Sequence, residues 1–247
     1  MHTLNEEGEN EMGVVLPIKN VTHSYEINPS KIIALGFNYL DHIKEKNSIN
    51  IKGFPNELPM EPILFPKTPN VLIGSGEPIV IPSFVKRYNF ENPRVDYEAE
   101  LALIISKKCK NVLPHDAFDC ILGFTCMNDV SQRNIQNSDN SGWFRGKSFD
   151  TFGPIGPVIV RPDDIGNVQE LKIICRLNGH VVQEASTALM IFPIDKIVSF
   201  VSHNFTLEVG DIIMTGTPSG VGAIKHGDIV EIEIENIGIL KNPVIEE

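Results

Sequence analysis

The stretch VDYEAELALII, residues 95–105, most constrains how this chain can fold. Side chains alternate between the two faces of an extended strand, so Asp96, Glu98 and Glu100 share one face. The LALII end has the composition of a buried strand, which places a row of like charges at the edge of a core. Such a row predicts either a solvated strand edge or a site that needs several carboxylates.

The rest of the chain shows short apolar runs separated by Pro, Gly and Asn. These runs predict strands at 31–36, 63–65, 71–73, 78–82, 123–131, 171–177, 180–186, 210–216 and 227–240. The Asn178-Gly179 pair suits a two-residue type I′ turn, so the strands on either side of it form a hairpin.

Helical character is restricted to a few short segments. Residues 38–47 and 114–121 favour brief helices, and apolar residues recur at three- and four-residue steps over 193–204. The polar stretch that ends at about 141 shows no such period. The pattern predicts one mostly-β α+β domain with few short helices.

Composition and charge exclude several classes of protein. The chain has 247 residues, 42% of them hydrophobic, which is enough for a sizeable core. Its net charge is −11, from 32 acidic and 21 basic residues, which argues against a nucleic-acid surface or a polybasic membrane anchor. An anionic substrate stays possible, because a few local cations or a metal can reverse the field in one cleft.

The N-terminus and the cysteines point to the cytoplasm. Residues 1–12 are acidic and polar, unlike a secretory signal, and we expect a flexible tail followed by a single domain over 13–247. No apolar run approaches the roughly 20 residues that span a bilayer. The four cysteines form no CxxC pair, which favours free thiols in a reducing compartment: Cys109, Cys120, Cys126 and Cys175.

A bound divalent cation would explain why two carboxylates share one strand face. Glu98 and Glu100 offer only oxygen ligands, which favour Mg²⁺ or Mn²⁺ over zinc or copper. Asp129, at the end of the apolar run GFTCMN, is the best candidate for a third ligand. The alternative is a solvated strand face that carries charge for solubility, and Asp96 fits that description.

Three further features could take part in catalysis or in substrate binding. His42 and Glu45 are three residues apart and would share a helix face, so the carboxylate could orient an imidazole that deprotonates water. Lys147 lies in a turn-rich segment and could neutralise an enolate or a carboxylate. Residues 215–218, TGTP, form a tight turn whose amides and hydroxyls could hold a carboxylate. For the pair and the lysine, the alternative is an ordinary surface position.

The order of seven motifs resembles the fumarylacetoacetate hydrolase family. They are GFNYLDHIKE, EPILFPKTPN, VDYEAELALII, GFTCMNDVSQRNIQ, GWFRGKSFDTFGPIGP, LNGHVVQEAST and GDIIMTGTPSGVG. The resemblance runs from about residue 31 to the C-terminal strand and fits the small single-domain branch. It implies a mixed β-sandwich roll of the type found in the family's C-terminal domain, usually as a homodimer.

The resemblance also implies roles for particular residues. A Mg²⁺ or Mn²⁺ ion is held by three carboxylates, which match Glu98, Glu100 and Asp129. The family's catalytic groups match His42, Glu45 and Lys147, and its substrate-binding positions match Arg133, Gln136 and Thr217.

These positions imply a small 2-oxo-acid substrate, and hydrolysis of an acylpyruvate is the favoured reaction. Oxaloacetate decarboxylation, a dienoate isomerase or tautomerase, and a non-catalytic 2-oxo-acid binder are alternatives. Residues 46–60, where family members differ most, leave the substrate open. Residues 83–94 depart from the family pattern, because they are longer than the usual link into the acidic strand.

Overall fold

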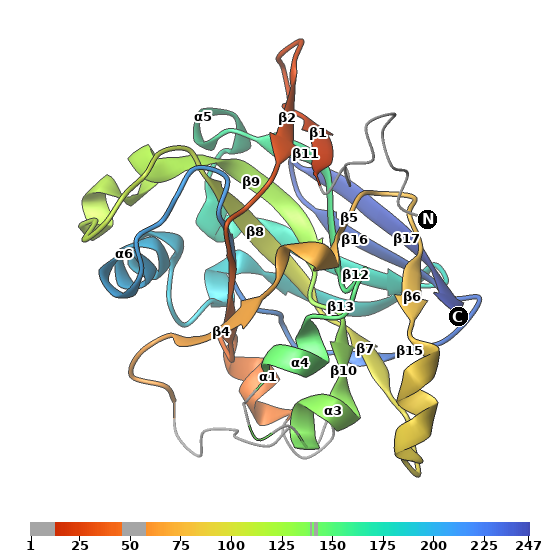
Figure 1. Cartoon of the computed structure of the whole chain (residues 1–247). Helices are drawn as coiled ribbons and strands as arrows, with labels where there is room; N and C mark the ends of the chain where they lie inside the picture. Colours follow the sequence, from red (N-terminus) through yellow and green to blue (C-terminus); the bar gives the residue numbers. More distant parts are fainter. Residues whose placement is uncertain (1–12, 46–57, 139, 141–142) are drawn as a thin grey trace, which may run out of the picture.

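A computed structural model describes residues 13–45, 58–138, 140 and 143–247 (Figure 1). Strands dominate this part of the chain, helices are short, and the sheets curl around one another, which confirms the expected mostly-β α+β fold. The predicted tail, residues 1–12, lies outside the described residues.

A mixed sheet forms the centre of the described structure. Across the sheet, its seven strands are β4 (Ile63–Lys67), β3 (Ile32–Gly36), β14 (Ile212–Met214), β8 (Ala99–Ile105), β9 (Ile121–Asn128), β11 (Gly153–Val160) and β5 (Leu72–Ile73). The pairs β3–β14 and β11–β5 are parallel, and the other neighbours are antiparallel. The long pair β8–β9 lies at the middle of Figure 1.

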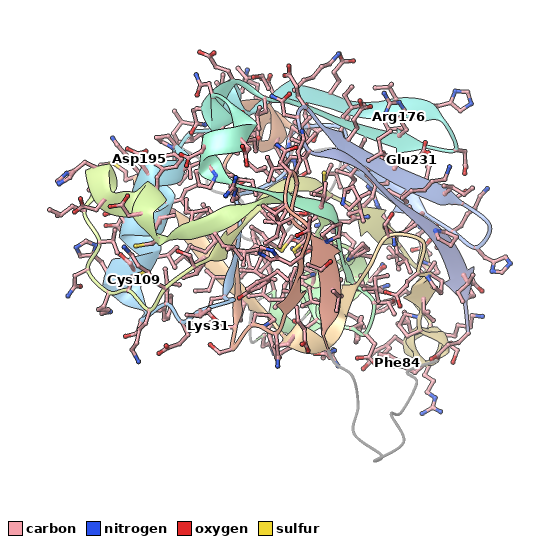
Figure 2. The ribbon with its side chains drawn as sticks, turned by 90° about the horizontal axis from the view of Figure 1, so that it is seen from above. Lys31, Phe84, Cys109, Arg176, Asp195 and Glu231 are labelled. Carbon is pink, nitrogen blue, oxygen red and sulfur yellow. The ribbon has the colours of Figure 1, made fainter. Side chains whose placement is uncertain are left out.

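A second sheet packs against the first. Its described strands, in order, are β13 (His180–Ser186), β12 (Lys172–Leu177), β16 (Ile229–Ile234), β17 (Gly238–Glu246) and β6 (Ile79–Ile81). Asn178 and Gly179 have φ values of 53° and 81°, the positive values of a type I′ turn, so the predicted hairpin is confirmed. Arg176 of β12 and Glu231 of β16, labelled in Figure 2, are directly opposite each other. Arg176 forms its ion pair with Glu233, two residues further along β16, at 2.6 Å, and such opposite-charge pairs stabilise neighbouring strands.

Two smaller sheets complete the strands of the described residues. One contains β10 (Ser131–Gln132), β7 (Val95–Tyr97) and β15 (Gly222–Ile224), and the other contains β1 (Val14–Pro17) and β2 (Ser24–Ile27). The acidic stretch is therefore two strands and not the single strand that the sequence suggested. Its first part, β7, pairs in the three-stranded sheet, whereas β8 pairs in the central sheet.

The helices are short, and three of them gather at one end of the molecule. Within the described residues, the α-helices are α1 (Leu40–Lys44), α3 (Arg133–Ser138), α4 (Phe144–Lys147), α5 (Pro162–Ile165) and α6 (Ile194–Asn204). The 3-10 helices of the same residues are η1 (Pro69–Val71), η2 (Ser83–Tyr88), η3 (Pro114–Cys120), η4 (Val168–Glu170) and η5 (Thr187–Leu189). In Figure 1, α1, α3 and α4 lie together beside β10 and β7. Among the described residues, no helix is long and apolar enough to cross a bilayer.

The sequence predicted α6 well and missed α3. Helix α6 has the apolar period that the sequence shows, with Pro193 at its N-cap. Helix α3 has no apolar stripe and is held by polar contacts, because Gln132 Oε1 accepts a hydrogen bond from the Ile135 amide at 2.8 Å. Periodicity cannot reveal a helix that depends on such contacts. The long 83–94 segment contains η2.

Strand β8 separates two hydrophobic clusters. Leu101 and Leu103 point into the larger cluster, which the second sheet also lines, whereas Ala102 and Ile104 point into a smaller one beneath β1 and β2. The whole strand is therefore buried on both faces. The four cysteines are free thiols, as expected.

The two-sided burial of β8 predicts a large loss of stability when its core is truncated. Leu103 is 0% exposed, so Leu103→Ala should reduce the free energy of unfolding by about 2–5 kcal/mol. Leu113→Ala is the matched control, because Leu113 is 51% exposed and should cost far less. Urea unfolding monitored by circular dichroism measures both values, and equal losses would contradict this account of the core.

Candidate active site and metal centre

The junction between β7 and β8 brings two of the predicted ligands together. At Glu98, the chain leaves one sheet and enters another, so its backbone lacks regular strand partners there. The Glu98 amide donates to Asn128 Oδ1 at 3.0 Å, and its carbonyl accepts from the Asp129 amide at 2.9 Å. These two bonds hold Asp129 directly beside Glu98.

Glu98, Glu100 and Asp129 form a buried carboxylate cluster. One oxygen atom from each side chain lies within 4.8 Å of the other two, and each residue is at most 4% exposed. Around Mg²⁺, neighbouring oxygens are about 3 Å apart and opposite ones about 4 Å, so side-chain rotations that bring the three oxygens closer together would let them bind one ion. The negative charge of the cluster and its oxygen-only ligands both favour a hard divalent cation.

Two buried lysines neutralise much of the charge of the carboxylate cluster. Lys147 Nζ donates to Glu98 Oε2 at 2.8 Å and to Asp129 Oδ2 at 2.5 Å. Lys67 Nζ donates to Asp129 Oδ1 at 2.7 Å. Lys147 is only 2% exposed and ends helix α4, so the alternative of a surface loop lysine is wrong.

The neighbouring charges separate the pKa values of the two glutamates. Burial and the charges of Asp129 and Glu98 raise the pKa of Glu100 well above its usual value. Burial alone would also raise the pKa of Glu98, but Lys147 and Arg133 outweigh it and hold that pKa below its usual value. Glu98 is therefore the more firmly ionised of the two.

Asp96 is buried and not solvated, which corrects the expectation from the strand pattern. It is 0% exposed, and its two oxygens accept from Arg94 Nε at 2.5 Å and from Arg133 Nε at 2.8 Å. Arg133 then donates to Glu98 Oε1 at 2.6 Å. Asp96 lies outside the carboxylate cluster and orients Arg133, which in turn contacts Glu98 of the cluster.

Arg133 and Gln136 lie one turn apart on α3 and are both buried. Arg133 Nη1 donates to Gln136 Oε1 at 2.6 Å, so the guanidinium fixes the amide as well as Glu98. Both residues line the same pocket. Their proximity depends on the helix that the sequence did not predict.

His42 and Glu45 form the predicted pair on α1. His42 Nδ1 and Glu45 Oε2 are 3.2 Å apart, and the imidazole stacks on Phe37 with ring centres 5.9 Å apart. The other oxygen, Glu45 Oε1, accepts from the Gly220 amide at 2.6 Å. The ring is 4% exposed and held on two sides, so the alternative of an ordinary surface pair is wrong.

The TGTP turn holds one of the protein's own carboxylates. Gly216 has a φ of 95°, a conformation that favours glycine, and its amide donates to Glu100 Oε2 at 2.8 Å. Thr217 lines the pocket, and its Oγ1 accepts from Gln183 Nε2 at 2.9 Å. The turn therefore orients a residue of the cluster and presents a threonine to the pocket.

One pocket brings most of the predicted site residues together. It is lined by Leu35, Gly36, Phe37, His42, Phe65, Glu98, Glu100, Arg133, Gln136, Trp143, Lys147 and Thr217. Asp129 and Glu45 lie directly behind it, in contact with Lys147 and His42 respectively. Residues 46–57, most of the segment expected to vary with substrate, lie outside the described residues.

Sequence reasoning missed three residues at the site. Lys67 and Gln183 each make buried hydrogen bonds to a site residue, and Trp143 packs edge-on against Phe37 and Phe65. Lys67 follows directly after the apolar run ILFP, and this position could have predicted a paired, buried lysine, because a charge at the end of a buried strand needs a partner. No comparable signal marked Gln183 or Trp143.

Known proteins are similar to this chain in sequence and fold. The chain is 39% identical to the mitochondrial oxaloacetate tautomerase of Homo sapiens, over 94% of this chain and 72% of the relative. The structure of 2-hydroxyhepta-2,4-diene-1,7-dioate isomerase from Mycobacterium marinum matches with a TM-score of 0.76 and 37% identity, covering 91% of this chain and 79% of the other.

A third relative was solved with bound ligands. The structure of fumarylpyruvate hydrolase from Pseudomonas aeruginosa, in complex with Mn²⁺ and pyruvate, matches with a TM-score of 0.83 and 26% identity. The match covers 98% of this chain and 100% of the other. Residues 31–245 match the family model described as fumarylacetoacetate (FAA) hydrolase C-terminal. The chain therefore belongs to the fumarylacetoacetate hydrolase family.

Proposed function

We propose that this protein is a Mg²⁺- or Mn²⁺-dependent enzyme that acts on a small 2-oxo acid through its enolate. Its main reaction is proton transfer at C3, which interconverts the keto and enol forms of an oxaloacetate-type substrate. The observation that carries the proposal is a single pocket in which a carboxylate cluster, an oriented imidazole and a buried lysine meet.

The carboxylate cluster and Lys147 stabilise negative charge. Glu98, Glu100 and Asp129 would hold a divalent cation, which when bound would supply Lewis-acid stabilisation of the charge that develops on the 2-oxo oxygen. Lys147 borders the same pocket and carries its positive charge throughout, because Asp129 and Glu98 outweigh burial and keep its pKa above the usual value. Its ammonium group is therefore available as a hydrogen-bond donor where charge develops.

His42 moves the proton. Its Nδ1 faces Glu45, which assigns proton transfer to the opposite ring nitrogen, Nε2. Nε2 takes the proton from C3 while the electron pair moves to the 2-oxo oxygen, which gives the enolate. Water then protonates this oxygen to give the enol and takes the extra proton from the imidazolium, and the reverse sequence regenerates the keto form. Glu45 stabilises the imidazolium that forms, and the Gly220 amide holds this carboxylate in place.

Polar side chains around the pocket bind the substrate carboxylate. Gln136 and Thr217 line the pocket from different elements and present an amide and a hydroxyl. Arg133 fixes the position of Gln136 and adds positive charge. These groups orient the 2-oxo acid so that C3 faces the imidazole.

Hydrolysis of an acylpyruvate is the second candidate, because the same His42–Glu45 pair could deprotonate a water molecule. The P. aeruginosa relative, named a hydrolase, supports it. Proton transfer is placed first because the relatives named tautomerase and isomerase are 39% and 37% identical to this chain, against 26% for that hydrolase.

A substrate panel separates these reactions. With Mn²⁺ present, we expect faster loss of the enol absorbance of oxaloacetate than of acetylpyruvate, without release of pyruvate. Pyruvate release from acetylpyruvate would favour the hydrolase, and pyruvate with CO₂ from oxaloacetate would favour a decarboxylase. Binding of oxalate with no turnover of any 2-oxo acid would contradict enzymatic activity and indicate a binding protein.

Removing the charge of Glu98 should prevent metal binding. Glu98→Gln keeps the shape of the side chain, and we expect Mn²⁺ affinity and turnover to fall at least about 100-fold. Titration with Mn²⁺, followed by electron paramagnetic resonance, measures the affinity after chelator treatment. Glu184→Gln, on the exposed face of β13, is the control and should bind like the wild type. Wild-type affinity in Glu98→Gln would refute the metal site.

Replacing His42 should slow the reaction without affecting the metal. Asparagine cannot act as a base, so His42→Asn should lower kcat by about 10²–10⁴-fold while KM and Mn²⁺ affinity stay near wild type. His115→Asn, at a ring that is 75% exposed, serves as the control. A kcat close to the wild-type value would rule out His42 as the proton carrier.

A further inference from the structure

Lys67 is a completely buried lysine that reaches the carboxylate cluster from behind. It ends strand β4, its side chain is 0% exposed, and it does not line the pocket. Its ammonium donates to Asp129 Oδ1 at 2.7 Å and to the main-chain carbonyl of Lys147. One side chain thus contacts both an acid of the cluster and the backbone of the pocket lysine.

The two contacts determine how Asp129 can act. Because Lys67 binds Oδ1, the other oxygen, Oδ2, is the one that accepts from Lys147, which also donates to Glu98. Lys67 also fixes the end of α4, the helix that carries Lys147. The position of one ammonium group therefore sets the direction of Asp129 Oδ2 and of the Lys147 side chain together.

Burying the charge of Lys67 costs desolvation free energy. The side chains of Lys67 and Asp129 are both 0% exposed, and the desolvation of two such charges can exceed the gain from their ion pair. A well-packed apolar side chain in place of such a pair is often neutral or stabilising. A stabilising role alone therefore gives little reason for a lysine at this position.

We propose that Lys67 is a positioning residue, which holds Asp129 as a one-oxygen ligand and aims Lys147 into the pocket. The inference rests on the proposed metal site and adds a residue to it. Hydrogen-bond partners behind a ligand typically contribute 10–100-fold to metal affinity.

A purely electrostatic role and a positioning role of Lys67 lead to opposite predictions for Lys67→Met. Removing a positive charge beside the cluster should strengthen Mn²⁺ binding if Lys67 acts only through electrostatics. If Lys67 orients Asp129, binding should weaken by about 10–100-fold, and the pocket lysine should also lose its alignment, lowering kcat. Mn²⁺ titration of the metal-free protein measures the affinity independently of turnover.

Lys31→Met is the matched control. Lys31, labelled in Figure 2, precedes β3 and forms an ion pair with the buried Asp211, away from the pocket. Its loss tests the general effect of breaking a partly buried ion pair, so Mn²⁺ affinity should stay at the wild-type value. An equal fall in both variants would overturn the specific role of Lys67.

Two further outcomes keep the two proposals separate. If the wild-type protein fails to bind Mn²⁺, the proposed metal site is wrong. If the wild type binds Mn²⁺ and Lys67→Met binds it as tightly or more tightly, only the Lys67 inference fails. Should Lys67→Met not fold, Lys67→Leu, which also removes the N–H donors, replaces it, and a loss of Mn²⁺ affinity below tenfold overturns the inference.

Discussion

The hydrogen-bonded junction at Glu98 is the constraint on which the rest of the site depends. Here the chain passes from the three-stranded sheet to the central sheet, and the backbone of Glu98 is satisfied by Asn128 and Asp129 in place of a regular strand partner. Buried backbone groups need such partners. The partners come from the end of β9, so satisfying the backbone also brings the third carboxylate to the first two.

Charge balance then decides which side chains must surround the junction. Four carboxylates are buried here, the cluster and Asp96, and buried like charges are stable only when they are paired. Arg94, just before β7, supplies one cation to Asp96, and the others come from three separate elements: Lys67 from β4, Arg133 from α3 and Lys147 from α4. Each element is therefore fixed in position by an ion pair, which explains why short helices with little apolar surface gather at this end of the sheets.

Local patterns in the sequence were enough to predict much of this arrangement. The alternation in VDYEAELALII placed Glu98 and Glu100 on one face, and the Asn178-Gly179 pair predicted the hairpin, because both depend on residues close together in the chain. Helix α3 and the burial of Asp96 could not be predicted in this way. Both depend on Arg133, whose partner on the acidic stretch is more than thirty residues away in the chain.

Local patterns in the sequence specify the mostly-β fold, the acidic pair at the edge of the core and, through the motifs, the fumarylacetoacetate hydrolase family. Those features depend on periodicity and on the order of the motifs, and neither requires contacts between distant residues. The binding of Asp96 to arginine and the contact of Lys67 with Asp129 arise only once the chain has folded. The reason is that a buried charge takes its role from the partner that neutralises it, and here those partners come from distant parts of the chain.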